Sequence, residues 1–515
     1  IFFFFFCVSM DLIKVNVALP NGRSEHFALP KSSKVGDLRI LAQKAFGQGF
    51  LRLVSDKGVM LDPEESLEFL GLEDHLTAVV LQPKLVAARD SFALWCCGGN
   101  TVITWGKGEG KGKSKAQKRN KGKGFGKLFD DDQLFLYGHD VQDSLNGVQD
   151  VKASQSAFAA IQADGSIVTW GLKHTGGDSS QVQDRLRSVQ QIQGTISAFA
   201  AILADGSVVA WGDPICGGNT ADVDGLFDVQ QLQATWGAFA AIKTDGSVVA
   251  WGHPLAGGDS STVQHQLKNV QQIQATHAAF AAILADASVV TWGDDEQGGD
   301  SCEVQHLLES VQQIQATRTA FAAIRADGSV VTWGDTTAGG DSSEVQNQLK
   351  NVQQIQATQA AFVAILGNGS VVTWGDCQYG GDKSEVKDQL KNVQKVQACD
   401  SAFAAVLADG SVVTWGDEDA CDTSGVLDQL QNVKQIQATQ GAFAAILADG
   451  SVVSWGDPGC GGDSSEVQDQ LRNVQLVQST DAAFAAIVSD GSLVTWGSTF
   501  CGGYSLHVQN QLAYL

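Results

Sequence analysis

The pair Trp-Gly recurs at intervals of 40 or 41 residues along most of this 515-residue chain. Around it the chain repeats a unit close to AFAAILADGSVVTWGD, followed by Gly-Gly. Nine copies place their tryptophans at Trp170, Trp211, Trp251, Trp292, Trp333, Trp374, Trp415, Trp455 and Trp496, and a divergent tenth copy comes first with Trp105. Repeats of this length indicate units that bury their hydrophobic faces only by stacking on their neighbours.

Each unit has the pattern of a small antiparallel sheet. AFAAILA and SVVTWG are strand-like, and Asp-Gly pairs such as Asp205-Gly206 predict a two-residue turn between them. QQIQAT predicts a further strand with Ile and Ala inward, and EVQDQLK predicts a fourth element, either a strand or a helical turn. Three or four short strands in about 40 residues is the size of one propeller blade. We expect the repeated Trp and Phe to fill the space between blades, rather than to bind a ligand.

The motif AFAAILADGSVVTWGD with its Gly-Gly resembles the repeat of the regulator of chromosome condensation family, whose units form β-propellers. The units here are shorter, and that family's His before the Asp-Gly turn is missing, with His277 two residues too early. Seven blades are usual in the family and this chain has ten units. The resemblance implies a mainly β protein whose residues 83–515 form a β-propeller, or a propeller-like stack, of about ten short repeats. A single ring, an unequal division and an open stack all remain open.

Residues 10–82 have a different pattern. Ile13, Val15 and Val17 alternate with polar residues, Asn21-Gly22 marks a hairpin, and Ser33 can cap a helix that ends at Gly47. With the stretch LRLVSDKGVMLDPEESLEFLGL, this order resembles the ubiquitin-like β-grasp fold, an α+β domain. We expect residues 1–9 to be an artefact or disordered.

The ubiquitin-like resemblance implies a surface that docks other proteins. Val54 falls at or next to the position where that family carries a surface hydrophobe gripped by partners. The alternative is that Val54 is an ordinary strand residue packed in the core. A conjugation role is not expected, because the chain continues through Pro83 instead of ending in a free Gly-Gly.

Comparison of the copies shows one slot that varies on a nearly fixed frame, just before the AF strand. Residues of equal repeat phase lie on the same face of a propeller, and varied loops on a scaffold often carry specificity. Trp236, His277 and Arg318 are consecutive members, and Trp and Arg are common interface anchors, so we expect a contact surface there. Neutral drift at exposed sites is the alternative. The slot contains Arg89, Gln155, Ile196, Trp236, His277, Arg318, Gln359, Asp400, Gln440 and Asp481. The loop after each Trp-Gly varies as well.

A basic insertion, residues 107–130, interrupts the first unit. Its segment 107–127 carries nine Lys or Arg side chains against one Glu, although the whole chain has a net charge of −23. A Gly/Lys tract cannot bury a core, so we expect disorder. It could bind RNA or an acidic partner, act as a nuclear-import signal, or rest as a solvated loop near the acidic propeller. Its basic residues include Lys111, Lys113, Lys115, Lys118, Arg119 and Lys121.

Nothing in the sequence has the spacing of a catalytic, phosphate-binding or metal-binding motif, so we expect no enzyme activity and no cofactor or metal. The ten scattered cysteines favour reduced thiols. The hypothesis is a non-catalytic interaction scaffold, linked to the ubiquitin pathway, that binds proteins through its variable loops. It would be cytoplasmic, with the nucleus as second location, and without a membrane partner. The alternatives are an exchange factor for a small GTPase, or a fragment of a HECT-type ubiquitin ligase.

Overall fold

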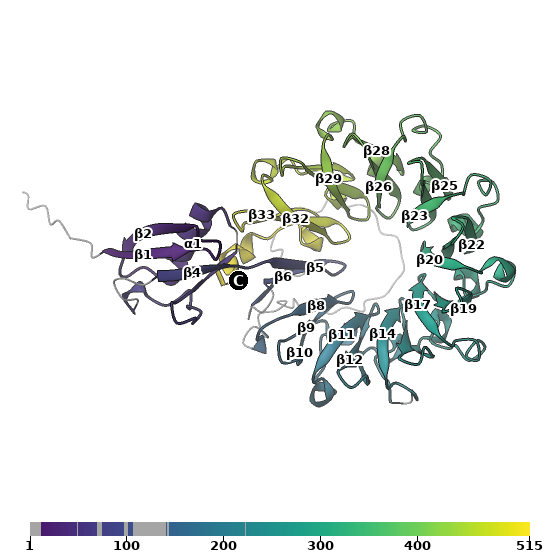
Figure 1. Ribbon diagram of the computed structural model, residues 1–515, viewed down its shortest axis with the longest axis horizontal. Helices are drawn as coiled ribbons and strands as arrows, with labels where there is room; N and C mark the ends of the chain where they lie inside the picture. The colour runs from purple at the N-terminus through teal and green to yellow at the C-terminus, as the bar shows by residue number, and fades with distance from the viewer. Residues whose placement is uncertain are drawn as a thin grey trace, which may run out of the picture.

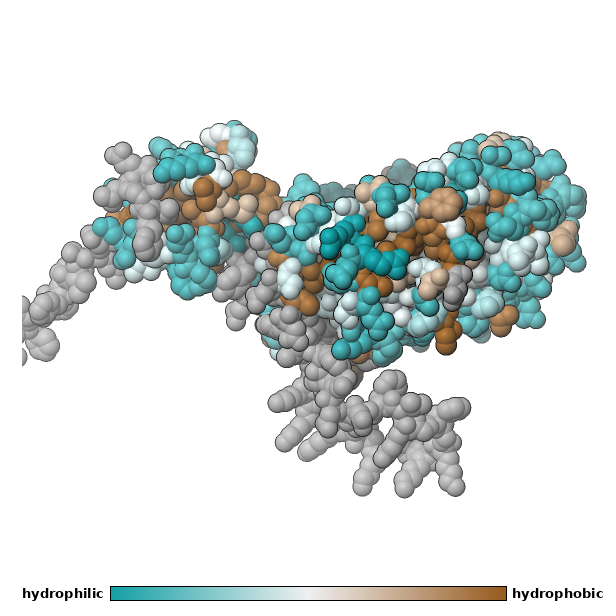
Figure 2. All heavy atoms as spheres, turned by 90° about the horizontal axis from the view of Figure 1, so that it is seen from below, coloured by the Kyte–Doolittle hydropathy of each residue, from teal (hydrophilic) through white to brown (hydrophobic). Residues whose placement is uncertain are grey.

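A computed structural model describes residues 12–48, 50–69, 75–96, 101–106, 141, 144–221 and 223–514. Ten three-stranded antiparallel sheets follow one another around a closed ring, and a four-stranded unit lies at its side (Figure 1). Seen edge-on, the ring is a flat disc (Figure 2). The prediction of a mainly β propeller of ten short repeats is therefore confirmed. Of the three possible arrangements, the repeats form a single closed ring, not an unequal division or an open stack.

In the N-terminal unit the strand order is β2-β1-β4-β3, with β1 antiparallel to β2 and parallel to β4. Its elements are β1 (Leu12–Ala18), β2 (Ser24–Pro30), α1 (Val35–Phe46), β3 (Leu51–Val54), the 3-10 turn η1 (Leu67–Phe69) and β4 (His75–Val80). Val35, Leu38 and Ala42 of α1 pack on the sheet in one hydrophobic core. The predicted end at Gly47 is confirmed, because Gly47 adopts the left-handed conformation there.

The helix start differs from the expectation. Lys34, not Ser33, occupies the N-cap position, and its backbone N–H donates to the carboxylate of Asp37 at 2.9 Å. Ser33 belongs to the preceding turn, where its N–H donates to the carbonyl of Pro30. A capping serine was expected to accept a backbone N–H of the first turn, but the carbonyls of Glu65 and Pro63 accept the N–H groups of Val35 and Gly36 instead.

The blades are numbered here in chain order. Their strands are β5 (Pro83–Ala87), β6 (Ser91–Cys96), β7 (Val102–Gly106); β8 (Asp150–Ala153), β9 (Ala157–Ile161), β10 (Ile167–Gly171); β11 (Val189–Gly194), β12 (Ala198–Leu203), β13 (Val208–Gly212); β14 (Val229–Ala234), β15 (Ala238–Lys243), β16 (Val248–Gly252); β17 (Val270–Ala275), β18 (Ala279–Leu284), β19 (Val289–Gly293); β20 (Val311–Ala316), β21 (Ala320–Arg325), β22 (Val330–Gly334); β23 (Val352–Ala357), β24 (Ala361–Leu366), β25 (Val371–Gly375); β26 (Val393–Ala398), β27 (Ala402–Leu407), β28 (Val412–Gly416); β29 (Val433–Ala438), β30 (Ala442–Leu447), β31 (Val452–Gly456); and β32 (Val474–Ser479), β33 (Ala483–Val488), β34 (Leu493–Gly497). The first strand of each blade is innermost, around the central channel (Figure 1).

The fourth element of each unit is not a strand. In blades 2, 5, 8 and 9 the EVQDQLK segment forms short 3-10 turns: η4 (Gln183–Arg185), η8 (Gln305–Leu307), η11 (Leu427–Gln429) and η13 (Gln468–Gln470). Its leucine is nevertheless buried, as at Leu308, where it joins the core between two blades. The segment therefore closes the outer side of the seam without adding to the sheet.

The Asp-Gly hairpin has three loop residues, not the two that were expected. The N–H of Leu203 donates to the carbonyl of Ser207, and the N–H of Gly206 donates back to the carbonyl of Leu203. Gly206 takes a φ of 77°, which closes a turn through Ala204 and Asp205. Asp-Gly is compatible with both loop lengths, and the third residue makes the bulge that fits the twist of the strands.

Each tryptophan is buried at the seam to the preceding blade, as expected. Trp211 stacks on Phe199 of its own sheet with 5.4 Å between ring centroids, and its Nε1 donates to the carbonyl of Gly176 in the previous blade at 2.9 Å. A Cβ on Gly176 would meet the Phe199 ring at 2.5 Å, which explains the glycine. The bond recurs in Trp105–Gly502, Trp251–Gly217, Trp292–Gly257, Trp333–Gly298, Trp374–Gly339, Trp415–Gly380 and Trp496–Gly461.

The seam between blades 8 and 9 lacks this bond. The loop of blade 8 contains the short helix α2 (Glu418–Cys421) where other blades have Gly-Gly, and the Cys421 carbonyl accepts instead from Thr414 at 3.0 Å. The buried Nε1 of Trp455 therefore has no acceptor among the described residues. An unpaired buried donor makes this seam weaker than its neighbours.

The N-terminal unit contacts the ring through a small hydrophobic junction. Phe50, at the start of β3, packs with Leu85 of β5 and with Val508 near the C-terminus. The Leu81 N–H also donates to the carbonyl of Phe50 at 2.8 Å. Only two residues separate β4 from β5, so this junction fixes where the smaller unit lies beside blades 1 and 10 (Figure 1).

Candidate interaction surface at the mouth of the channel

The ten varied residues form a collar around one mouth of the channel. Each stands in the turn between the first and second strands of its blade. Nine backbone hydrogen bonds of 2.8–3.2 Å join successive members: Gln155 N–H to the Ile196 carbonyl, then Ile196 to Trp236, Trp236 to His277, His277 to Arg318, Arg318 to Gln359, Gln359 to Asp400, Asp400 to Gln440, Gln440 to Asp481, and Asp481 to Arg89. The collar therefore has a hydrogen-bonded backbone and variable side chains.

A threonine holds the collar turn in seven of the ten repeats, and Ala88, Ser154 and Cys399 stand at its position in blades 1, 2 and 8. Thr235 Oγ1 accepts the N–H of Ala238 at 3.0 Å and donates to the carbonyl of Ala256 at 2.8 Å. Ala256 belongs to the loop after Trp-Gly, so the bond ties the two variable loops of one blade together on one face. Sequence reasoning missed this residue, although the threonine that recurs before the varied slot in most copies was a signal for it.

A cavity of about 840 Å³ lies inside the collar. All collar residues line it except Trp236, and Thr358, Cys399, Thr439 and Thr480 from the first-strand ends complete its wall. The wall mixes polar side chains with Ile196 and alanines such as Ala357 and Ala398, and it carries charges of both signs. Such a cavity can hold a polar segment of another chain.

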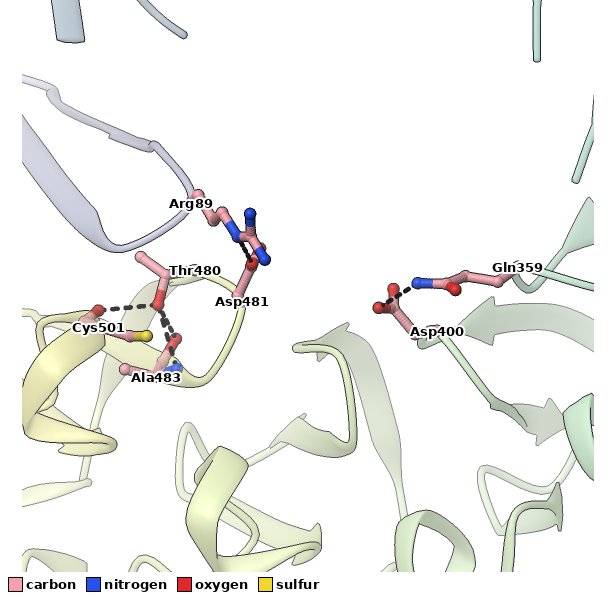
Figure 3. A network of polar contacts seen from close by, with 7 residues as sticks. All are labelled: Arg89, Gln359, Asp400, Thr480, Asp481, Ala483 and Cys501. Carbon is pink, nitrogen blue, oxygen red and sulfur yellow. Dashed lines mark hydrogen bonds and ion pairs between the residues drawn. The ribbon is translucent and has the colours of Figure 1, made fainter. Parts of the chain in front are cut away.

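One arc of the collar is acidic. Asp481 Oδ2 accepts from Arg89 Nε at 2.8 Å, and Asp400 Oδ2 accepts from Gln359 Nε2 at 2.6 Å (Figure 3). Burial raises the pKa of Asp400, and the neighbouring Asp481 charge adds to this, whereas the Gln359 hydrogen bond opposes it. Burial also raises the pKa of Asp481, against the lowering effect of Arg89.

The structure brings Trp236, His277 and Arg318 together in another arc, but their roles differ. Trp236 packs against its own blade, with its ring 4.9 Å from the ring of His253 and 6.0 Å from that of His277. It is half-buried against two seam cores and does not line the cavity. His277 lines the cavity, and its pKa is lowered by burial first and by Arg318 second. Arg318 is exposed at the same cavity.

Val54 lies on the outward face of the N-terminal sheet. Leu51 and Leu53 point into the core, so Val54 and Arg52 take the opposite face of β3. Val54 pairs with Thr77 of β4 and is half-buried. The alternative reading of Val54 as a core residue is therefore wrong. Exposed hydrophobic residues elsewhere on this unit include Val59, Met60, Val79 and Val80.

The remaining predictions concern the basic tract, the cysteines, metal ligands and membrane-spanning helices. The basic tract from Lys111 to Lys121 falls outside the described residues. Within the described ranges, eight cysteines are free thiols, and no cluster of His, Cys, Asp and Glu could hold a metal ion. No helix in the described part of the chain is long and apolar enough to cross a membrane.

No protein-family model matches the chain, and no curated protein matches it closely enough to count as a relative. Similar solved structures include yeast RCC1 (Prp20) bound to Kap60, at 15% identity over 58% of this chain and 80% of that chain, with a TM-score of 0.33. Others are the computationally designed Ika8 protein, at 16% identity over 60% and 96% with a TM-score of 0.28, and human WBSCR16, at 12% over 56% and 84% with a TM-score of 0.30. The fold assignment therefore stands on the chain's own hydrogen-bonded sheets, which make it a ten-bladed ring of the β-propeller type.

Proposed function

We propose that the protein is a non-catalytic scaffold that binds partner proteins at the collar. The observation that carries the proposal is the combination of a hydrogen-bonded collar backbone with side chains of six different types among its ten positions. A backbone held in place needs little ordering when a partner binds, so the varied side chains can contribute affinity and specificity. His277 and Arg318 face the cavity and are the residues expected to contact a partner.

The N-terminal unit is proposed as a second docking module. The order hairpin, helix and two further strands, with α1 on one face of the sheet, supports a ubiquitin-like β-grasp domain. The outward Val54 leaves a hydrophobic position on the opposite face for a ubiquitin-pathway partner. Because Phe50 packs this unit against the ring, a partner bound to the N-terminal unit and a partner bound to the collar would be held at a fixed distance from each other.

Affinity capture with quantitative mass spectrometry tests the scaffold function. The double variant His277→Ala/Arg318→Ala should lose the captured partners. His265→Ala/Lys268→Ala is the matched control, since it also removes one His and one cation, both exposed and outside the collar, and should capture like the parent chain. Equal capture by both variants would remove the collar as the binding surface.

The identities of the captured proteins separate the alternatives. Ubiquitin-pathway partners that are lost with Val54→Arg support the adaptor function. A small GTPase captured in its nucleotide-free state would support the exchange-factor alternative, and its retention by the collar variant would place the contact elsewhere on the ring. The same capture with residues 107–127 deleted shows whether the basic tract contributes, and RNase treatment shows whether that contribution depends on RNA.

A further inference from the structure

We propose that the collar binds a lysine or arginine side chain of a partner protein, with Asp400 as its counter-ion. This inference rests on the scaffold function and names the chemistry of the partner at the same site. Asp400 differs from the other acidic collar residue in its contacts. Asp481 is paired with Arg89, whereas the described residues provide Asp400 with a neutral amide, that of Gln359, and no ion pair.

The environment of Asp400 favours a cation. The carboxylate is half-buried, and a charge withdrawn from water without a counter-ion is destabilised. Burial is the largest influence on its pKa, and the Arg318 charge is the smallest. A partner's ammonium or guanidinium group would restore the missing charge partner, and hydrogen bonds between two ionised groups are about twice as strong as neutral ones.

The neighbouring side chains complete the site. Gln359 and Gln440 flank Asp400 in the collar, and Thr358, Cys399 and Thr439 line the cavity beneath them. Amide and hydroxyl oxygens can accept the further N–H donors of an ammonium or guanidinium group, which Asp400 alone cannot satisfy. Three positions further round the collar, Arg89 is already paired with Asp481 and does not compete for Asp400 (Figure 3).

The size of the opening fits a peptide segment. Backbone hydrogen bonds join nine of the ten neighbouring pairs of collar residues, which places the Cα atoms of each pair about 5 Å apart, and ten steps of about that length give an opening of roughly 16 Å between opposite Cα atoms. Collar side chains narrow this further. A loop or extended segment can enter, whereas an α-helix about 10–12 Å wide with its side chains would fill the whole opening. The net charge of −23 should also speed the arrival of a basic segment.

The test measures binding of a fluorescein-labelled peptide, Gly-Ser-Gly-Lys-Gly-Ser-Gly, to the full chain by fluorescence anisotropy. The same peptide with norleucine in place of lysine is the ligand control. Asp400→Asn should weaken binding of the lysine peptide by roughly tenfold, the change expected for loss of a charge-assisted contact of about 1.4 kcal/mol. It should leave the weak binding of the norleucine peptide unchanged.

Asp469→Asn is the matched protein control. It removes the same single charge from a side chain that is 99% exposed and outside the collar, and whose contact with Arg472 is also exposed, so it reports mainly the effect of net charge on binding. It should change binding by less than about twofold. Equal effects of the two variants, or equal binding of the two peptides, would overturn the proposal.

A second variant keeps the proposal testable if Asp400→Asn does not fold. Gln440→Trp places a bulky side chain at an exposed collar position beside Asp400 and should block the lysine peptide while the carboxylate stays in place. Unchanged binding by that variant would also contradict the proposal. If the peptide shows no dependence on Asp400 but capture still depends on His277 and Arg318, the inference fails and the scaffold function stands.

Discussion

Arg89 and Asp481 are 392 residues apart in sequence, yet Nε of Arg89 lies 2.8 Å from Oδ2 of Asp481. The backbone N–H of Asp481 also donates to the carbonyl of Arg89 at 3.0 Å. The pair joins the first and the last blade, and Trp105 repeats the closure at the seam by donating to the carbonyl of Gly502. Ring closure is therefore made by the same contacts that join neighbouring blades elsewhere.

The seam bond predicts unequal effects of one substitution at two blades. Trp333→Phe removes the donor to the Gly298 carbonyl and leaves that carbonyl unpaired, whereas Trp455→Phe removes a donor without an acceptor among the described residues. Trp333→Phe should lower the free energy of unfolding by about 1–2 kcal/mol more than Trp455→Phe. Urea denaturation followed by circular dichroism measures the difference. A larger loss for Trp455→Phe would contradict this account of the seams.

One turn stores strain that can be removed. Ala287 stands where other blades have the turn glycine, and it keeps a φ of 64°. A residue with a Cβ in this conformation costs about 1–2 kcal/mol, so Ala287→Gly should raise the unfolding free energy by about 1 kcal/mol. Gly328→Ala is the reverse control and should be destabilising, because its Cβ would also lie 2.8 Å from Cα of Asn351. A stabilising Gly328→Ala would disprove the explanation.

The Asp-Gly-Ser turns predict a loss of stability in acid. Asp327 accepts from the side chain and the backbone of Ser329, and these two bonds lower its pKa. A lowered folded pKa stabilises the fold above the ordinary aspartate value of about 3.9. The contribution disappears as pH falls below that value through the folded pKa. Thermal melts between neutral pH and about pH 3 should show the loss.

The chain provides the control for that prediction. Asn368 occupies the same turn position in blade 7 and accepts from Ser370 in the same two ways, without a titratable group. The Asp327→Asn variant should therefore fold at neutral pH. Its stability should fall slightly less in acid than that of the parent chain, because one of several titrating turns has been removed. An unchanged acid profile after Asn replacement in several turns would show that other carboxylates control it.

Much of this fold was predictable, for identifiable reasons. The period of Trp-Gly specified the blade length, and the short apolar run AFAAILA before the Asp-Gly turn specified the middle strand, because both are local features of the chain. Closure was not predictable, since it depends on small angles that accumulate over ten blades. The loop length at Asp205-Gly206 was ambiguous because both turn types accept these residues.

The candidate site was predictable in position but not in detail. Because the varied residues occupy the same position in every repeat, they were expected on one face of the ring. The backbone hydrogen bonds that join them into a collar are seen only in the structure. It was not predictable that Trp236 turns onto its own blade, because this depends on His253, seventeen positions later in the chain. Nor could sequence show that Arg89 pairs with Asp481 and leaves Asp400 with an amide partner, since those contacts form only in the closed ring.

Amide hydrogen exchange at Asp481 tests the closed ring and its collar most directly. Eight other collar amides donate within the collar between blades that follow each other in sequence, as that of Gln440 does to the Asp481 carbonyl, whereas the Asp481 amide donates across the closure to Arg89. A closed ring predicts that Asp481 is protected from exchange to the same degree as Gln440. Exchange at Asp481 as fast as in an unfolded peptide, with Gln440 still protected, would show an open stack and contradict the collar.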